Sequence, residues 1–297
     1  MGYSAVVVTY YPEKKHIKNI EKISKQVDYL FIVDNTDIEI TFPKFPRNVS
    51  IIKNRKNYGI AYALNVGLKL SEKLNVNGVF LFDQDSSAYD TFVRDMILFK
   101  EKIKDEKVIM FSPNFFDINV KAYASFFKFT RFKIKRIKCG GIIYPTLVIT
   151  SGSLLDIRAL KEIGYFNEIY FLDLVDNEYC FRILEKGYKI AVNCNIVLKH
   201  AIGKREEKKI LFLKIRPNNH PPFRKYYIIR NCIFNIKRFG KKYPSIVLWN
   251  LALITHTVLS VLFFEKEKRK KFLCIAKGLI DGLFFFPSGK TTLKEKC

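Results

Sequence analysis

The stretch Gly78-Val-Phe-Leu-Phe-Asp-Gln-Asp85 decides the fold. An apolar run of this length, ended by polar residues, is typical of a β-strand that is buried on both faces. Such strands belong to mainly parallel sheets covered by helices, where ligands bind beyond the carboxyl ends of the strands. Asp83 and Asp85 therefore stand where an α/β protein holds its ligand.

The same rhythm extends through the first two-thirds of the chain, where short β-branched runs alternate with longer helical patterns. It predicts an α/β domain with a Rossmann-like, mainly parallel sheet flanked by helices. Strands are expected at 4–9, 29–33, 49–53, 78–82, 107–111 and 146–150, and helices at 13–25, 60–74, 89–104, 156–163 and 174–186. The aromatic and basic stretch 113–145 interrupts this rhythm as either a hairpin or a mobile loop.

The last third of the chain is strongly basic, and it also contains the longest apolar run. Residues 201–297 hold 22 Lys and Arg against 6 Asp and Glu, within a total charge of +24. Residues 245–264 lack charged side chains and are about long enough to span a bilayer, although they include Asn250 and His256. Basic and apolar residues together favour an interfacial helix on an anionic membrane, with a spanning helix as the alternative. We divide the chain into a domain at 1–235 and a helical, membrane-associating region at 236–297.

The cysteines and the first residues bear on the compartment. The six cysteines form no C-x-x-C pair and no zinc-finger spacing, which is typical of a reducing environment. The first residues read as a buried strand rather than as a secretory signal. We therefore expect a cytoplasmic protein that associates peripherally with the inner face of the cell membrane.

Acidic residues are the best candidates for chemistry. Asp83 and Asp85 are two apart in an extended segment, so their carboxylates point the same way and suit Mg²⁺ or Mn²⁺ shared with a diphosphate. Asp34 follows another strand and suits the N–H and O–H donors of a nucleoside. Asp176 falls in the first turn of a predicted helix, where the helix dipole favours the ionised form that a general base needs. Ordinary turn and cap chemistry explains each of these residues equally well in isolation.

Several motifs occur in a specific order, and together they resemble a known family. They are Val6-Val-Val-Thr-Tyr10, Val33-Asp-Asn35, Asn57-Tyr-Gly-Ile-Ala-Tyr-Ala-Leu-Asn65, Phe82-Asp-Gln-Asp-Ser86, Thr150-Ser-Gly-Ser153, the segment from Phe171 to Arg182, His200-Ala-Ile-Gly203 and Arg224-Lys-Tyr-Tyr-Ile-Ile-Arg-Asn231. The set resembles the inverting family 2 glycosyltransferases of the GT-A fold. Its Asp-Gln-Asp-Ser form most resembles the bacterial rhamnosyltransferase branch. The likeness runs from about residue 4 to residue 235.

The resemblance implies a role for each matching residue. The nucleoside pocket would contain Thr9, Tyr10, Asp34, Asn35 and Asn57. The diphosphate and a divalent cation, Mn²⁺ or Mg²⁺, would lie at Asp83 and Asp85, with His200 as a further metal ligand. The acceptor pocket would be bordered by Ser151, Gly152 and Ser153, and Arg224, Tyr227 and Arg230 would approach either the acceptor or the phosphate. The catalytic base would be Asp176, because Val175 replaces one member of the acidic pair found in many relatives, although Asp173 lies close by.

By the same resemblance, the expected donor is dTDP-L-rhamnose, with a UDP-hexose or a galactofuranose donor as alternatives. The acceptor would be a lipid-linked oligosaccharide, and the product would feed a capsule, an O-antigen or another cell-wall polysaccharide. A nucleic-acid-binding protein would explain the charge of +24 but not the ordered acidic motifs, so we expect no nucleic acid partner. A nucleotidyltransferase would need a Gly-rich basic loop after the first strand, where Tyr11-Pro12 stands instead.

Overall fold

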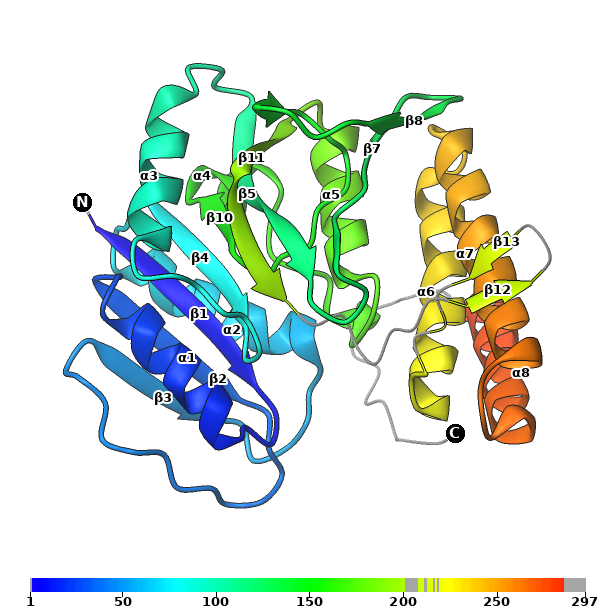
Figure 1. Ribbon diagram of the computed structural model, residues 1–297, viewed down its shortest axis with the longest axis horizontal. Coiled ribbons are helices and arrows are strands. Elements are labelled where there is room, and N and C mark those ends of the chain that lie inside the picture. The colour runs from blue at the N-terminus through cyan, green and yellow to red at the C-terminus, as the bar shows by residue number, and fades with distance from the viewer. Residues whose placement is uncertain (1, 201–207, 211–212, 216, 218, 286–297) are drawn as a thin grey trace.

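The computed structural model describes residues 2–200, 208–210, 213–215, 217 and 219–285 (Figure 1). Its main sheet runs β3-β2-β1-β4-β10-β5-β11-β9, with β6 paired to β5. These strands are β1 (Tyr3–Thr9), β2 (Tyr29–Asp34), β3 (Val49–Lys53), β4 (Gly78–Asp83), β5 (Val108–Asp117), β6 (Ala122–Tyr123), β9 (Ile142–Ile143), β10 (Ser153–Asp156) and β11 (Lys189–His200). Two hairpins pair β7 (Phe126–Phe129) with β8 (Ile134–Ile137), and β12 (Lys208–Ile210) with β13 (Leu213–Ile215).

The sheet is mixed but mainly parallel, which confirms the predicted α/β class. β1 pairs in parallel with β2 and β4, β2 with β3, and β5 with β11. β10 lies antiparallel between β4 and β5. The carboxyl ends of the parallel strands therefore meet at one edge, as the position of Asp83 required.

The strand predicted at 146–150 is wrong. These residues have no regular structure, and the strand begins only at Ser153. An isolated hydrogen bond connects the segment to β7: the Thr146 N–H donates to the Phe127 carbonyl at 2.8 Å. Gly152 then turns the chain with φ of 77°, and its N–H donates to the Leu81 carbonyl at 2.7 Å. The apolar pattern of 146–150 reflects burial rather than strand pairing.

Helices cover both faces of the sheet (Figure 1). One face packs on α1 (Lys14–Ser24) and α3 (Phe92–Lys102), and the other on α2 (Ile60–Lys73), α4 (Arg158–Glu162) and α5 (Val175–Glu185). Alternate residues of β1 enter the two cores: Ala5 and Val7 on the first face, Val6 and Val8 on the second. This double burial explains why β1 shows no alternation of apolar and polar residues.

The C-terminal helices form a separate layer beside the sheet (Figure 1). They are α6 (Pro222–Phe239), α7 (Pro244–Phe263) and α8 (Lys268–Phe284). The predicted boundary between 235 and 236 falls inside α6. The three helices are joined by a buried ionic cluster, in which Glu265 accepts hydrogen bonds from Lys225 and Lys271, both at 2.7 Å. All three side chains are at most 5% exposed.

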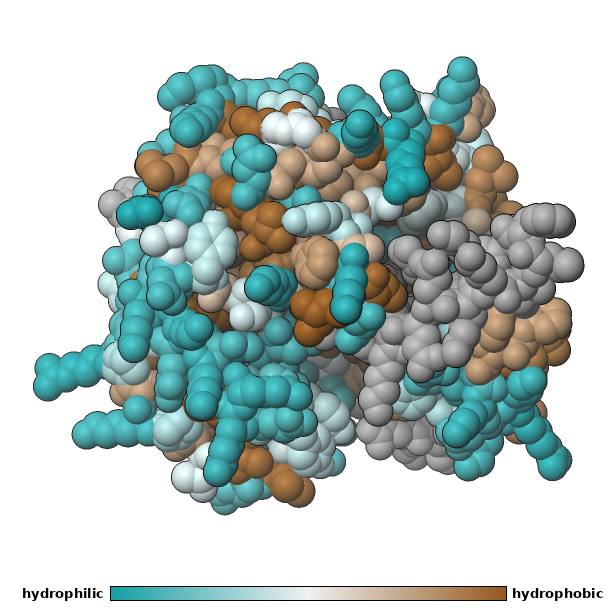
Figure 2. Space-filling view, viewed as in Figure 1, coloured by the Kyte–Doolittle hydropathy of each residue, from teal (hydrophilic) through white to brown (hydrophobic). Residues whose placement is uncertain are grey.

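Helix α7 buries several of its polar residues and exposes several of its leucines. Asn250, Thr257 and Ser260 are buried, whereas Leu248 is 59% exposed and Leu251 is 48% exposed. By length and composition, α7 is the one helix among the described residues that could cross a membrane. Figure 2 shows hydrophobic patches along the outer edge of this helical layer. Membrane association itself stays a prediction.

Two cysteines form a disulfide that their spacing in the sequence did not indicate. Cys139, which follows β8, is bonded to Cys194 of β11 across a separation of 55 residues. Cys180, Cys232 and Cys274 are buried and are not part of this disulfide. Because disulfides are commoner in oxidising compartments, the cysteines give no support to the predicted reducing environment.

Candidate active site

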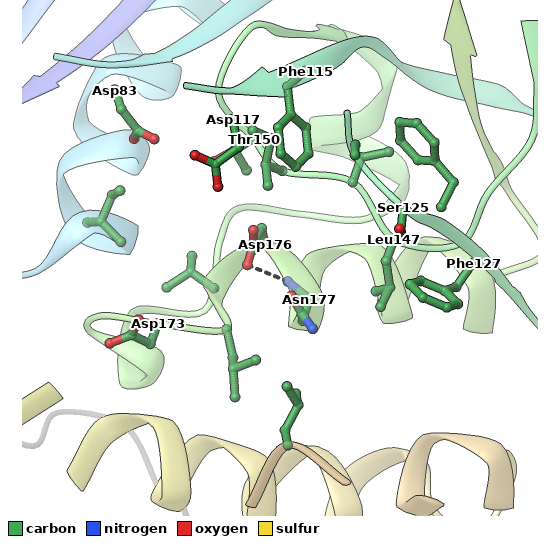
Figure 3. Close-up of a pocket in the computed structure, with 18 of the residues that line it drawn as sticks. Asp83, Phe115, Asp117, Ser125, Phe127, Leu147, Thr150, Asp173, Asp176 and Asn177 are labelled. Atoms are coloured by element: carbon green, nitrogen blue, oxygen red, sulfur yellow. Dashed lines mark hydrogen bonds between the residues drawn. The ribbon is translucent and has the colours of Figure 1, made fainter. Parts of the chain in front are cut away.

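A cavity of about 510 Å³ lies where the carboxyl ends of β4 and β5 meet the start of α5 and the side of α7. Figure 3 shows the carboxylates of Asp83, Asp173 and Asp176 toward one side of the cavity and the apolar side chains of Phe127 and Leu147 on the other. Its charged residues are Asp83, Asp117, Asp173, Asp176 and Arg224. Its apolar wall includes Phe115, Phe127, Leu147, Trp249 and Leu253. The cavity therefore offers carboxylates beside an apolar surface.

Asp176 lies at the second position of α5 and lines the cavity. Burial raises the pKa of its carboxyl to about 6, and the nearby carboxylates of Asp83 and Asp173 act in the same direction. The Asn177 N–H, which donates to Asp176 Oδ1 at 2.9 Å, lowers the pKa but does not offset burial. A carboxyl group with this pKa is mostly ionised at pH 7, yet is more basic than an exposed aspartate, which suits a general base.

Asp173 is engaged in an ion pair. Arg224 of α6 donates from Nε to Asp173 Oδ2 at 3.0 Å and from Nη2 to Oδ1. Both side chains are largely buried. The guanidinium occupies both carboxylate oxygens of Asp173, so this pair favours Asp176 over Asp173 as the base.

The residues predicted to line a nucleoside pocket lie together at the ends of β1, β2 and β3. Thr9 Oγ1 donates to Asp34 Oδ1 at 2.8 Å, and Asn35 Nδ2 donates to the Gly59 carbonyl at 3.0 Å. Asn57 Oδ1 accepts from the Gly59 N–H at 2.9 Å. Gly59 has φ of 88°, and a Cβ there would lie 2.5 Å from the Phe171 carbonyl oxygen. Only glycine therefore fits at position 59, between the start of α2 and the turn that leads to α5.

Tyr10 connects the two halves of the site. Its N–H donates to Gln84 Oε1 at 2.8 Å, and its carbonyl accepts from Gln84 Nε2 at 3.1 Å. Gln84 stands between Asp83 and Asp85, so the loop after β1 is fixed directly against the acidic motif after β4. A nucleotide bound by the loop after β1 would place its phosphates beside these carboxylates.

The predicted metal ligands are only partly described. Asp83 lines the cavity, Asp85 is partly buried and does not line it, and the side chain of His200 lies outside the described residues. The backbone of His200 ends β11 opposite Asp117. Within the described part of the chain, no three His, Cys, Asp or Glu side chains converge as a metal site. The strand ends at Asp83 and a turn follows, in which the Ser86 N–H donates to the Asp83 carbonyl at 3.1 Å, so the predicted extended segment through Asp85 is wrong. A cation held by both carboxylates stays a prediction, and Mg²⁺ or Mn²⁺ there would take its other ligands from phosphates and water.

The three residues predicted to border the acceptor pocket lie behind the wall of the observed cavity. Ser151, Gly152 and Ser153 are buried, and the cavity is lined instead by the preceding segment, from Leu147 to Thr150. Ser151 Oγ hydrogen-bonds Ser86 Oγ, and Ser153 Oγ donates to Ser112 Oγ at 3.0 Å. These two hydrogen bonds hold the cavity wall against the end of β4 and against β5.

Of the three α6 residues predicted to approach the acceptor, only Arg224 lines the cavity. Tyr227 is buried and stacks on Phe171 with ring centroids 4.9 Å apart. Arg230 is buried, and its guanidinium donates to the Ile169 carbonyl at 2.6 Å. The structure thus gives Tyr227 and Arg230 packing contacts with the turn before α5.

Asp117 is the main cavity residue that sequence reasoning missed. It ends β5, which extends six residues beyond the predicted strand at 107–111. Its position resembles that of Asp83, a carboxylate at the end of a strand in the same sheet. The polar Ser112 and Asn114 within β5 hid the continuation of the strand, because the sequence pattern appears to stop there.

Comparisons with known proteins agree with this geometry. No family model matches the chain. The dTDP-rhamnosyl transferase RfbF of Shigella flexneri is 27% identical over 281 residues, covering 90% of this chain and 89% of that protein. TarS of S. aureus superposes with a TM-score of 0.54 at 14% identity, over 90% of this chain and 44% of TarS.

GalNAc-T7, solved with UDP, GalNAc and Mn²⁺, superposes with a TM-score of 0.52 at 9% identity, over 87% of this chain and 57% of GalNAc-T7. At these identities the two structures support the fold alone. The relative from Shigella adds a homologue across nearly the whole chain. The chain has the GT-A fold found in glycosyltransferases and is a distant homologue of a dTDP-rhamnosyl transferase.

Proposed function

We propose that the protein transfers L-rhamnose from dTDP-rhamnose to a lipid-linked glycan, with inversion at the anomeric carbon. The observation that carries this proposal is that Asp83, from the acidic motif after β4, and Asp176, at the start of α5, line the same cavity. The first is a candidate for the diphosphate side and the second for the acceptor side. The rhamnosyl donor is suggested by the name of the Shigella relative, and a UDP-hexose remains the alternative.

In the proposed reaction, Asp176 accepts the proton of an acceptor hydroxyl, and the hydroxyl oxygen forms a bond to the anomeric carbon. The bond from that carbon to the diphosphate oxygen breaks on the opposite face. Thr9, Asp34 and Asn57 orient the nucleoside, and Asp83 stands beside the diphosphate. A divalent cation bound by Asp83 and Asp85 would neutralise the leaving diphosphate. Positioning of the reactants supplies most of the acceleration.

We also propose that α7 and α8 rest on the anionic inner face of the cell membrane, where a lipid-linked acceptor is found. The support is the exposed leucines of α7, followed by exposed basic residues at Lys266 and in the first turn of α8, at 268–270. Buried polar residues in α7 point the same way, since its apolar side chains are left outside. Trp249 and Leu253 of α7 line the cavity, so the acceptor site would adjoin the membrane-facing helix.

A donor screen tests the proposal. Purified protein is incubated with Mn²⁺ or Mg²⁺ and a panel of dTDP- and UDP-sugars, and the released nucleoside diphosphate is measured. We expect release from dTDP-rhamnose above all other donors, stimulated by the cation and abolished by EDTA. Release from a UDP-hexose alone would replace the rhamnosyl assignment while keeping the enzyme class. Release from no donor, with acceptor glycans present, would contradict the function.

A further inference from the structure

The turn before the candidate base has an unusual backbone. Phe171, Asp173 and Leu174 have positive φ angles of 46°, 60° and 59°. Residues other than glycine rarely adopt positive φ angles, and none of the three is glycine or asparagine, the residues that tolerate them best. Such a conformation persists only where the surroundings over-determine it. Because Leu174 is the N-cap of α5, the shape of this turn sets the position of Asp176 two residues later.

One side chain of α6 binds three carbonyl oxygens of this turn. Asn231 is fully buried, and its Nδ2 donates to the carbonyl oxygens of Tyr170, Leu172 and Asp173 at 2.9, 2.9 and 2.8 Å. An amide group has two N–H bonds, so its donors are fully committed to the turn. Its Oδ1 in turn accepts from Arg230 Nε at 3.1 Å and Nη2 at 2.9 Å.

The opposite side of the turn is held by the start of α2, next to the predicted nucleoside-binding residues. The Phe171 carbonyl, between two of those that Asn231 binds, accepts from the Ile60 N–H of α2 at 2.7 Å. The turn is therefore held between α6 and the helix that begins beside Gly59. A change on α6 would therefore reach Asp176 through the turn.

We propose that Asn231 is a positioning residue for the proposed transfer: it holds the turn 170–174 so that the Asp176 carboxylate faces the acceptor hydroxyl. This proposal rests on the proposed function. Without the three hydrogen bonds, the turn relaxes toward negative φ and moves the start of α5. A misplacement on the order of 1 Å at a reacting group reduces rate about 100-fold. The expected loss is therefore in kcat and not in donor affinity.

The test compares Asn231→Ser with Asn235→Ser. Asn235 is also fully buried on α6, one turn later, but it accepts from the Tyr170 hydroxyl at 2.7 Å and binds none of the turn carbonyls. For each variant, kcat, donor Kd and hydrogen exchange of the 170–176 amides are measured. Asn231→Ser should lower kcat by roughly 10- to 100-fold, keep donor Kd within about twofold and speed exchange in the turn. Asn235→Ser should leave kcat within about threefold.

A rescue separates positioning from loss of folding. Leu174→Gly accepts positive φ without strain, so in the Asn231→Ser background it should restore part of kcat. Equal kcat losses in Asn231→Ser and Asn235→Ser, or unchanged exchange in the turn, would overturn the proposal. If the wild-type protein transfers no sugar, the proposed function fails, whereas the exchange measurement still tests whether Asn231 holds the turn.

Discussion

The sheet domain and the C-terminal helical layer are built in opposite ways. The sheet buries apolar side chains and presents polar ones at one edge, where Asp83 ends β4. The helical layer buries polar side chains, including Asn231 and Glu265, and exposes leucines such as Leu248. The sheet edge therefore contributes groups that are candidates for chemistry. The helical layer contributes the contacts that hold those groups, together with an apolar face.

The largest expected effect tests the chemical side of this comparison. Asp176→Asn keeps the shape of the side chain but cannot accept a proton, so kcat should fall by about 10²- to 10⁴-fold. Donor Kd should stay within about twofold, measured by calorimetry. Asp173→Asn is the matched control, because Asp173 pairs with Arg224, and it should lose far less activity. A larger loss in Asp173→Asn than in Asp176→Asn would reassign the base.

The second prediction concerns the polar interior of the helical layer. Glu265→Gln leaves Lys225 and Lys271 buried without their carboxylate, and loss of one partner of a buried ion pair costs about 3–5 kcal/mol. Denaturant unfolding should show this loss. Glu267→Gln is the control, because its pair with Lys270 is exposed, and it should change stability by less than about 1 kcal/mol. A stable Glu265→Gln protein would mean that the cluster does not hold the helices together.

Gly59 tests the close contact between the start of α2 and the turn before α5. In Gly59→Ala the new Cβ would meet the Phe171 carbonyl at 2.5 Å, with φ at 88°, so the turn must shift. We expect a loss of about 1–3 kcal/mol in the free energy of unfolding, together with reduced kcat. Gly140→Ala, where a Cβ would meet nothing within 4 Å, should be neutral in both assays. Equal behaviour of the two variants would remove Gly59 from the account.

The pH dependence of kcat/KM tests the pKa of Asp176, and near neutral pH the expected change is smaller than those above. Because the free carboxyl of Asp176 has a pKa raised to about 6 and only its ionised form accepts a proton, kcat/KM should be level above about pH 7. It should then fall about tenfold per unit as the pH drops below 6. A profile that stays level down to pH 5 would indicate that no group with this pKa controls the reaction.

The outer face of the helical layer should produce the mildest change. Leu248→Ser and Leu251→Ser remove exposed apolar area from α7, so binding to vesicles containing anionic lipid should weaken several-fold. Activity on a soluble acceptor should be unchanged. Leu98→Ser is the control, because Leu98 is 47% exposed on α3 in the sheet domain. If all three variants bind vesicles as the wild type does, the membrane face is elsewhere.

The sequence predicted the sheet better than it predicted the site. Local apolar runs determine β1 to β4, so the strands and the residues at their ends, Asp34 and Asp83, could be read directly. The role of Asn231 could not, because it depends on backbone carbonyls 58 to 61 positions away that show no side-chain pattern. The strand at 146–150 failed for a similar reason. Its apolar, β-branched run matched a strand, but contacts with β7 and the cavity account for its burial.

The anomeric configuration of the product tests the central claim most directly. Once the donor screen identifies a substrate, the first-formed product is analysed by NMR for the configuration at the transferred sugar. Transfer in one displacement, with Asp176 acting only as a base, predicts a configuration opposite to that of the donor. Retention would show that the reaction passes through a second displacement, and the assignment of Asp176 as a simple base would be wrong.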